Sequence, residues 1–554
     1  MASAKPVGIW KPVPPGSRAR VSCFSCRESK RSCDKSLPTC YLCRRKGIEC
    51  YYPQHRGQKN PSPIDDGANL GNVTAGSASE TTQPKKAQDL VNAEAIRFLA
   101  PDLFRDMNLQ VPRLNWEIPA EIEAQLGSQQ QMQETTTAFL QLTKSWMPIV
   151  NGKRHLAAVL NPLVPLRRPT ALLALCMKLC CLPVDKVEEK AVLYELVKKL
   201  YAEVERQEDS CLQVMQSAVF IAVFEMGDAI FPAAYLTVGA LARYGMARGM
   251  DKINQTALGK DCAATVGASW ADIEEMRRVW WGALILDRLL NVSQPSRGLS
   301  TADPSFEDFL PVDDEFFYSQ SSSPEHATRI SEGFTFKMGS FARLCQAMHL
   351  ISKSLSLCRI ASNSSEAPQN STSEEVGQLC RTLESLVRVN ELEATSRRLA
   401  FCSQSCVSYI GILLLQQHYW RQPGHESEQN SARNIFPETI SALETLVRIS
   451  ATLREGGYEL SQYLEDGRCS LFLVELVYQG MLVLLRMGKL WLAEDVQSKK
   501  ESLTWLLSHM GKRWPLVGKI MIQILYPFTN AVTAVYKRIL EARESLLAVE
   551  DALT

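Results

Sequence analysis

The sequence from Cys23 to Cys50 decides the fold of the N-terminal part, and it reads CFSCRESKRSCDKSLPTCYLCRRKGIEC. It contains the spacing C-x2-C-x6-C twice, with a short loop between the two copies. The six cysteines are Cys23, Cys26, Cys33, Cys40, Cys43 and Cys50. Paired C-x2-C units favour zinc ligation over a disulfide framework, which stays the more remote alternative.

The number of sulfur atoms bears on the number of metal ions. Zinc prefers four thiolates in a tetrahedron, with Zn–S distances of about 2.3 Å. Six sulfurs satisfy two such ions only when two of the sulfurs bridge them. The doubled spacing therefore predicts two Zn2+ ions. The alternative is a single ion held by the two C-x2-C pairs. It leaves Cys33 and Cys50 unexplained, although they occupy equivalent positions in the two halves.

Basic residues concentrate at the same end of the chain. Residues 1–60 contain thirteen Lys and Arg against three Asp and Glu, a net charge of +10, and the remainder contains 48 against 57. The net charge of +1 for all 554 residues hides this division. A basic N-terminal segment followed by an acidic remainder predicts that the N-terminal segment binds a polyanion.

The cysteine-rich stretch resembles the fungal binuclear zinc cluster DNA-binding domain over its whole length. Besides the six spacings, the resemblance includes Arg27 directly after the second cysteine and Lys30 between the second and third. It also includes Asp34 after the third cysteine and Pro38 in the central loop. The resemblance implies that Cys23 and Cys40 bridge both ions. The terminal ligands it implies are Cys26 and Cys33 on one ion, and Cys43 and Cys50 on the other.

The same resemblance implies how the module meets double-stranded DNA. A short helix follows each C-x2-C, and the first helix points its C-terminal end into the major groove. Lys30 then donates to guanine O6 and N7 in a CGG-type triplet. The residues that lie near phosphates are Arg27, Arg31, Arg44, Arg45 and Lys46. Ser29 and Ser32 stand where the family usually has a basic residue, so we expect a modest affinity and a shallower salt dependence.

From about residue 90 the sequence has helical periodicity. Residues 171–182, 191–207 and 274–292 place apolar side chains at i, i+3, i+4 and i+7. We therefore predict a mainly α protein with a small zinc cluster domain, a flexible linker and a large all-helical regulatory domain. Three polar gaps are predicted as surface loops. They are residues 318–326, 361–375 and 421–434.

The predicted boundaries follow the changes in composition. A disordered N-terminus covers residues 1–20, the zinc cluster domain 21–53, the linker 54–88 and the helical region 89–554. The linker has no apolar heptads that would indicate a dimerising coiled coil. A possible homodimer is therefore left to the helical region.

Residues 135–315 resemble the middle homology region of fungal zinc cluster regulators. The segments that carry the resemblance are residues 145–179, 231–251, 274–288 and 298–316. The sequences of these segments are similar to those of regulators encoded beside secondary-metabolite biosynthesis genes. The alternative is a regulator of primary metabolism or stress genes.

Aromatic and charged residues within this region receive a structural interpretation first. Trp280 and Trp281 are predicted to lie in the core, and Asp287 and Arg288 to cap or pair within the fold. The same structural interpretation extends to Arg277, Arg278, Tyr235 and Tyr244. An effector pocket lined by these residues is the alternative.

Several function classes lack support in the sequence. The sequence contains no P-loop, no G-x-S-x-G and no H-E-x-x-H, and the histidines do not cluster. It has no apolar secretory segment at its N-terminus and no uncharged apolar stretch long enough for a membrane span. We therefore predict no enzyme and no membrane partner.

The prediction is a nuclear transcription regulator that binds a GC-rich triplet in double-stranded DNA and recruits transcriptional machinery. The alternatives are a zinc module that binds protein or RNA, and an enzyme fused to a DNA-binding head.

Overall fold

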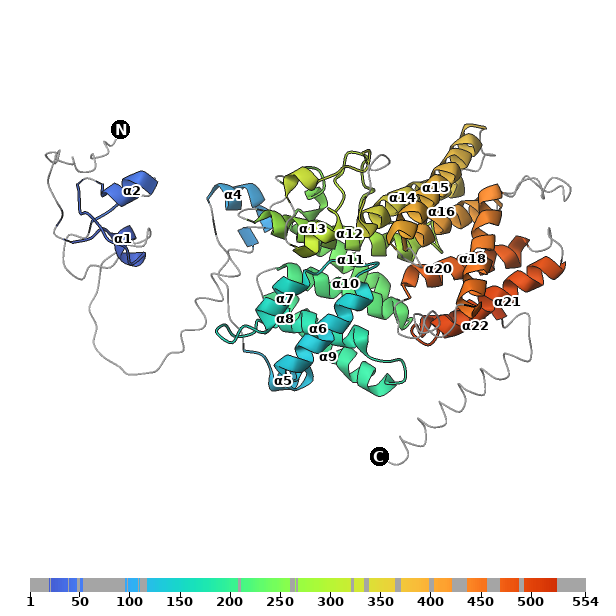
Figure 1. Cartoon of the computed structure of the whole chain (residues 1–554), viewed down its shortest axis with the longest axis horizontal. Helices are drawn as coiled ribbons and strands as arrows, with labels where there is room; N and C mark the ends of the chain where they lie inside the picture. The colour runs from blue at the N-terminus through green and yellow to red at the C-terminus, as the bar shows by residue number, and fades with distance from the viewer. Residues whose placement is uncertain are drawn as a thin grey trace, which may run out of the picture. The chain divides into compact units, whose positions relative to one another are not determined.

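The computed structural model divides the chain into two compact units, residues 1–81 and 82–554 (Figure 1). The structure describes residues 19, 21–37, 39–46, 50–52, 95–96, 98–107, 109, 117–207, 211–259, 265, 268–319, 323–332, 338–363, 370–397, 403–420, 436–455, 469–487 and 493–525. The predicted linker 54–88 and, apart from Ala19, the predicted disordered N-terminus lie outside these residues. The four domain boundaries therefore stay predictions.

The first unit contains two short helices, α1 (Phe24–Glu28) and α2 (Tyr41–Lys46). Each begins one residue after the first cysteine of a C-x2-C pair, so the helices start inside the motifs rather than after them. The ends of the module are tied together, because the Phe24 amide donates to the Tyr51 carbonyl at 2.9 Å. What the module buries at its centre is sulfur rather than hydrocarbon.

The second unit is built from α-helices and short 3-10 turns. Its helices are α4 (Pro101–Asp106), α5 (Ala120–Leu126), α6 (Gln129–Thr143), α7 (Gly152–Val159), α8 (Arg168–Cys181), α9 (Val187–Gln207), α10 (Leu212–Gly227), α11 (Ala233–Ala247), η1 (Met250–Lys252), α12 (Trp270–Asn291), α13 (Asp314–Ser319), η3 (Pro324–His326), α14 (Ser340–Asn363), α15 (Asn370–Arg397), α16 (Ser403–Trp420), α18 (Pro437–Glu455), α20 (Leu471–Met487), α21 (Ala493–Met510) and α22 (Leu516–Leu525). The described residues contain no β-strand, and in this unit they form an isolated bridge between Phe309 and Arg329. The prediction of a mainly α fold is confirmed.

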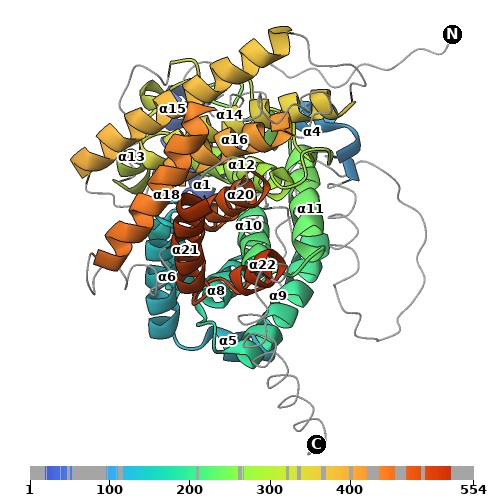
Figure 2. The same ribbon diagram turned by 90° about the vertical axis from the view of Figure 1, so that its right-hand side faces the viewer.

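Two central helices organise this unit. Helix α10 is apolar on all sides and is buried along nearly its whole length, because α8, α9, α11 and α12 pack around it. Helix α16 has the same role in the C-terminal half, among α14, α15, α18 and α20. In Figure 2, α21 and α22 lie in front of α8 and α10.

The two halves share one apolar core, which extends from Ile122 to Met521. Helix α12 contacts α10 and α11 on one side and α14 on the other. The end of α10 also meets the segment before α22, where a Cβ on Gly227 would lie 2.3 Å from Trp514. Residues 82–554 therefore do not separate into an N-terminal and a C-terminal domain within the part that the structure describes.

The predicted helices and loops can be compared with the observed bounds. The segments 171–182 and 274–292 correspond closely to α8 and α12. The predicted loop 361–375 is wrong at both ends, because α14 reaches Asn363 and α15 begins at Asn370. Glu374 and Glu375 are exposed on α15, so the polar composition there reflects solvation rather than a break in the helix.

The other two predicted loops have different outcomes. In 318–326, Tyr318 and Ser319 end α13 and residues 324–326 form η3, whereas 320–322 are outside the described residues. The loop 421–434 lies wholly outside them.

The structural interpretation of the residues in and around α12 is confirmed for the tryptophans and the charged residues. Trp281 is fully buried, and its indole N–H donates to the Phe309 carbonyl at 3.1 Å. Arg288, also fully buried, pairs with Asp287 at 3.2 Å and with Asp303 at 3.0 Å. These side chains hold the following loop against the helix.

Two further arginines of α12 are buried and ion-paired, although the Nε of Arg277 has no hydrogen-bond partner among the described residues. Arg278 pairs with Glu274 at 3.0 Å and with Asp314 at 2.8 Å. Arg277 pairs with Glu274 and donates to the Ala257 carbonyl at 2.7 Å. Tyr235 and Tyr244, by contrast, are only half-buried.

No helix among the described residues is both long and apolar enough to span a membrane.

Candidate metal centre and nucleic-acid interface

Four sulfur atoms lie at the centre of the N-terminal module. Cys23, Cys26, Cys40 and Cys43 are at most 3% exposed, and their sulfurs lie within 4.8 Å of one another. The Cys40 Sγ lies 3.8 Å from that of Cys23 and 3.7 Å from that of Cys26. A tetrahedron with Zn–S bonds of about 2.3 Å has S–S edges of about 3.8 Å. The spacing therefore fits thiolates around zinc and is far too long for a disulfide.

The remaining two cysteines join the same centre. Cys33 and Cys50 are both half-buried beside the other four. The Sγ of Cys33 lies 3.9 Å from that of Cys23, and the Sγ of Cys50 accepts a hydrogen bond from the Cys40 amide at 3.4 Å. All six cysteines predicted from the spacing are therefore brought together.

One distance shows why the ligand assignment to each ion stays a prediction. The sulfurs of Cys26 and Cys43 are 4.0 Å apart, which suits a single tetrahedron. In the bridged arrangement these two cysteines hold different ions, and edge-sharing tetrahedra would place them about 5 Å apart. The argument for two ions therefore rests on the positions of Cys33 and Cys50.

Cys40 is distinguished from its neighbours by the donors around its sulfur. Burial acts to raise its pKa, but the Cys43 amide at 3.4 Å and the surrounding thiols outweigh that effect and lower the pKa to about 6. Burial raises the pKa of Cys26 and of Cys43 to about 12. Because zinc binds the thiolate form of each cysteine, metal binding would release protons from this cluster.

Asp34 links the two halves of the module. One carboxylate oxygen accepts from the Tyr41 amide at 2.9 Å, at the start of α2, and the other accepts from the Ser36 hydroxyl. The Ser36 hydrogen bond is the main cause that lowers the pKa of Asp34. The carboxylate also faces the positive end of the α2 backbone dipoles.

Tyr52 is a supporting residue that the sequence reasoning did not identify. Its hydroxyl donates to the Ser36 carbonyl at 2.8 Å and lies 3.9 Å from the Sγ of Cys33. It closes the module behind the last cysteine. The only signal in the sequence is a pair of tyrosines after Cys50, which by itself indicates nothing specific.

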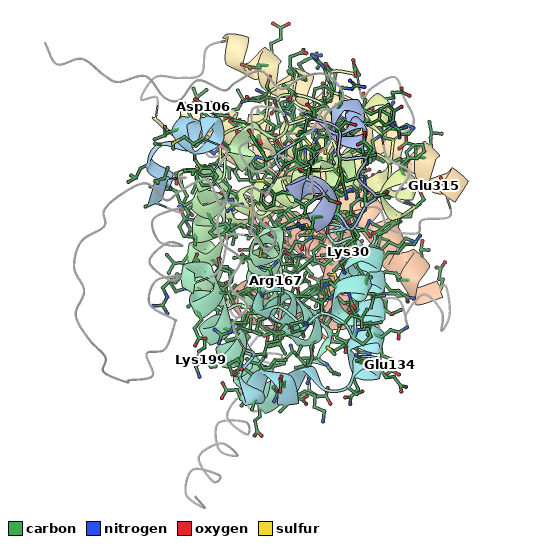
Figure 3. All side chains as sticks on the ribbon, turned by 90° about the vertical axis from the view of Figure 1, so that its left-hand side faces the viewer. Lys30, Asp106, Glu134, Arg167, Lys199 and Glu315 are labelled. Atoms are coloured by element: carbon green, nitrogen blue, oxygen red, sulfur yellow. The ribbon has the colours of Figure 1, made fainter. Side chains whose placement is uncertain are left out.

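Lys30 lies in a tight turn that ends α1 (Figure 3). Its amide donates to the Arg27 carbonyl at 3.1 Å, and the Arg31 amide donates to the Cys26 carbonyl at 2.9 Å. This pair of bonds is the Schellman pattern, which places Lys30 in the left-handed region, at a φ of 49°. A residue with a Cβ is strained there by about 1–2 kcal/mol. Glycine would be the cheaper choice.

The predicted DNA-contacting side chains are all exposed. Arg27 lies in α1, and Arg31 follows the turn at Lys30. Arg44, Arg45 and Lys46 form the last turn of α2, where the backbone dipoles favour positive charge. The module therefore presents cations around a buried sulfur centre.

Two family models match the chain in the regions just described. That of the fungal Zn(2)-Cys(6) binuclear cluster domain matches residues 21–59, and that of the fungal specific transcription factor domain matches residues 169–393. No solved structure matches the chain.

Curated relatives are regulators from fungi. Transcription factor BOA15 of Botryotinia fuckeliana is 36% identical over 162 residues, which are 29% of this chain and 86% of that protein. The notoamide biosynthesis cluster transcriptional coactivator notQ' of Aspergillus versicolor is 23% identical over 58% of this chain and 63% of its own length. The pestheic acid cluster transcriptional regulator 2 of Pestalotiopsis fici is 34% identical over 18% of this chain and 23% of its own length.

A sulfur-lined zinc module and a large helical region define the class of a metal-dependent DNA-binding regulator. The chain belongs to the fungal binuclear zinc cluster transcription factors. Its N-terminal domain is of the kind that binds two zinc ions and DNA. Members of this family are generally not enzymes, and the family implies a nuclear location.

Proposed function

We propose that the zinc module recognises a CGG-like triplet in duplex DNA, with Lys30 as the residue that reads the bases. The observation that carries this proposal is the strained turn at Lys30. An exposed lysine occupies a left-handed position that would cost glycine nothing. A lysine at the exposed C-terminal end of α1 can donate to guanine O6 and N7 in the major groove.

The metal ligands of the proposal are the six cysteines. Cys23 and Cys40 bridge the two ions, and each ion is completed by two of Cys26, Cys33, Cys43 and Cys50 in the pairs implied by the resemblance. Zinc would fix both helices to one centre, and this would hold Lys30 in register with the other basic residues.

The remaining basic side chains would contact phosphates and position the module without reading sequence. They are Arg27, Arg31, Arg44, Arg45 and Lys46. Ser29 and Ser32 are exposed near Lys30 in the sequence. Because the family usually has basic residues at these two positions, the surface around Lys30 has fewer cations for phosphate contacts. A second half-site would then raise affinity, and a homodimer formed through the helical region would supply it.

The regulated genes are proposed to be a secondary-metabolite biosynthetic cluster transcribed by RNA polymerase II. Support comes from two relatives, which are named as regulators of the notoamide and pestheic acid clusters. The helical region would recruit the transcriptional machinery. Regulation of primary metabolism or stress genes is the alternative outcome, and genome-wide mapping of bound sites in the native fungus would distinguish the two.

Selection of sites from a random duplex library tests base recognition directly. Zinc-loaded full-length protein would be compared with Lys30→Ala and Arg45→Ala at one stated salt concentration. Alanine keeps a Cβ at the left-handed position, so Lys30→Ala removes the amine without relieving the strain of the turn. We expect the wild type to enrich a CGG-like triplet, and Lys30→Ala to lose that preference at a cost of about 1–3 kcal/mol.

Arg45→Ala is the matched control for charge. It should weaken binding to all sequences about equally and reduce the salt slope by about one, while the selected triplet stays the same. Failure of the zinc-loaded wild type to enrich any duplex would contradict the proposal. That result would favour a module that binds protein or RNA.

A further inference from the structure

A cavity of about 510 Å³ opens into the helical unit between α7, α8, α10, α11 and α12. This volume lies in the range of small-molecule sites in proteins. The side chains around its mouth include Arg154, Arg167 and Arg248, all of them half-exposed. Figure 3 shows Arg167 near the middle of one face of the helical unit.

The backbone around the cavity favours negative charge. Helices α7, α8, α10 and α12 all present residues of their first two turns to it, whereas only α11 contributes its C-terminal end. First-turn amides carry the positive end of the helix dipole. The first turns of α7 and α12 are capped by the side chains of Asn151 and Ser269, whereas the N-cap of α10 makes no side-chain cap hydrogen bond.

The charged side chains of the lining also favour a negatively charged ligand. Three arginines face two carboxylates, those of Asp272 and Glu275. Both carboxylates pair with Arg154, the one on Glu275 at 2.9 Å. Glu275 also accepts from the Asn151 amide at 3.1 Å and from Gln216 at 2.9 Å. The acids are thus satisfied within the protein, and the lining as a whole carries an excess of positive charge.

His155 supplies a second, independent indication of a ligand. It is only 6% exposed and lines the cavity, yet its Nε2 has no hydrogen-bond partner among the described residues. Burial lowers the pKa of His155 to about 4, so the ring is neutral at physiological pH. A buried polar nitrogen without a partner costs about 1–3 kcal/mol. A polar group of a bound molecule would remove that cost.

Part of the remaining lining is apolar, and part is polar, as at Thr170, Gln213 and Tyr244. The apolar part includes Leu173 and three methionines, Met215, Met250 and Met276. Methionine side chains have a flexible thioether that adjusts to differently shaped ligands. The cavity therefore combines a cationic entrance with an apolar wall.

We propose that this cavity binds a small organic carboxylate with an apolar body, its carboxylate toward the arginines and its body against the methionines. Arginine forms paired hydrogen bonds with a carboxylate, and backbone amides at helix N-termini add further donors. The cavity lies within the helical unit, so the proposal does not depend on which DNA sequence the zinc module reads. The chain would thereby bind a metabolite at a site separate from DNA.

Isothermal titration of zinc-loaded full-length protein with 2-naphthoate tests this binding. The neutral analogue 2-naphthamide has the same ring system without the charge. We expect saturable binding of naphthoate at one site and binding of the amide at least tenfold weaker. Arg248→Gln should weaken naphthoate binding about tenfold or more, as loss of a charge-assisted hydrogen bond would. Arg243→Gln is the matched control, because Arg243 is exposed on α11, the helix that Arg248 caps, and does not line the cavity.

A second variant guards against misfolding of the arginine mutants. Ala158→Trp places a large side chain at the exposed rim of α7, where it should block entry without removing any charged group. We expect it to abolish naphthoate binding while its melting temperature without ligand stays near that of the wild type. Equal binding of acid and amide, unchanged binding in both Arg248→Gln and Ala158→Trp, or no binding at millimolar naphthoate would each overturn the proposal.

Discussion

The two units of the chain solve the problem of a stable interior in opposite ways. In the zinc module the buried centre is a group of cysteine sulfurs, with Phe24 as its buried aromatic side chain. In the helical unit, Phe139, Phe220 and Trp281 belong to a continuous apolar core. A segment of about thirty residues cannot bury enough hydrocarbon to fold alone, so it needs a metal ion or another cross-link. The first unit therefore depends on metal ions for a stable interior, whereas the second has an apolar core of its own.

Arginine shows the same contrast. In the module, Arg31, Arg44 and Arg45 are exposed, as phosphate contacts require. In the helical unit, Arg277 and Arg278 are fully buried, and their charges are matched by carboxylates and carbonyls. One residue type is therefore proposed to serve DNA binding in one region, and it has a structural role in the other. Exposure and partners decide which role it has.

Removal of the proposed bridging sulfur of Cys40 should have the largest effect, and this effect should be confined to the zinc module. Cys40→Ala takes a ligand from both proposed ions, so we expect loss of both zincs and of all DNA binding. The helical unit should keep its melting temperature within about 1 °C, because its core contains none of these sulfurs. Native mass spectrometry and calorimetry on the same sample would measure both. Retention of two zincs by this variant would refute the bridging assignment.

Truncation of a buried arginine should have the opposite effect: it should destabilise the helical unit and leave the zinc module unchanged. Arg278→Ala leaves Glu274 buried without one of its partners, and Asp314 loses its ion pair. We expect the helical unit to lose about 3–5 kcal/mol of unfolding free energy, while zinc content stays unchanged. Urea unfolding followed by tryptophan fluorescence would measure the loss.

Arg388→Ala is the control for this substitution. Arg388 is 72% exposed and pairs with Glu384 one helical turn away. Its removal should cost about 0.5 kcal/mol or less. A similar cost for both variants would show that the buried network does not stabilise the unit.

Acid sensitivity offers a smaller test of the helical core. His349 is 1% exposed, and burial, helped by nearby Lys353, lowers its pKa to about 4. The unfolded chain binds a proton at this ring below about pH 6.5, whereas the folded chain does so only near pH 4. The contribution of neutral His349 to the unfolding free energy is therefore fully present at neutral pH. It is lost as the pH falls from about 6.5 to about 4. From pH 7 to 5, His349→Leu should lose about 2 kcal/mol less unfolding free energy than the wild type. Equal losses in urea titrations of the two proteins would contradict this assignment.

The sequence predicted those structural features whose pattern lies within one short stretch of residues. The spacing of the cysteines predicted the sulfur centre, because the short segments between them keep the six thiols close together. Periodicity predicted α12 for the same reason, since its pattern repeats within one helix. Both signals lie within a few turns of chain.

Other features had no local signal. The left-handed turn at Lys30 carries no glycine to mark it, and Tyr52 gains its role only from contacts with Cys33 and Ser36. The cavity in the helical unit brings together side chains that are far apart in sequence, such as His155 and Arg248. Their convergence depends on tertiary packing, which composition and periodicity do not encode.

Hydrogen exchange on the full-length protein, with and without a zinc chelator, tests the contrast between the two units most directly. The account predicts that chelation removes the protection of amides in α1 and α2, including those of Arg27 and Arg44, which are hydrogen-bonded to the Cys23 and Cys40 carbonyls. Amides of α10 and α12 should exchange as slowly as before. Persistent protection of the module after both zincs have been removed would contradict the account, as would loss of protection in α10.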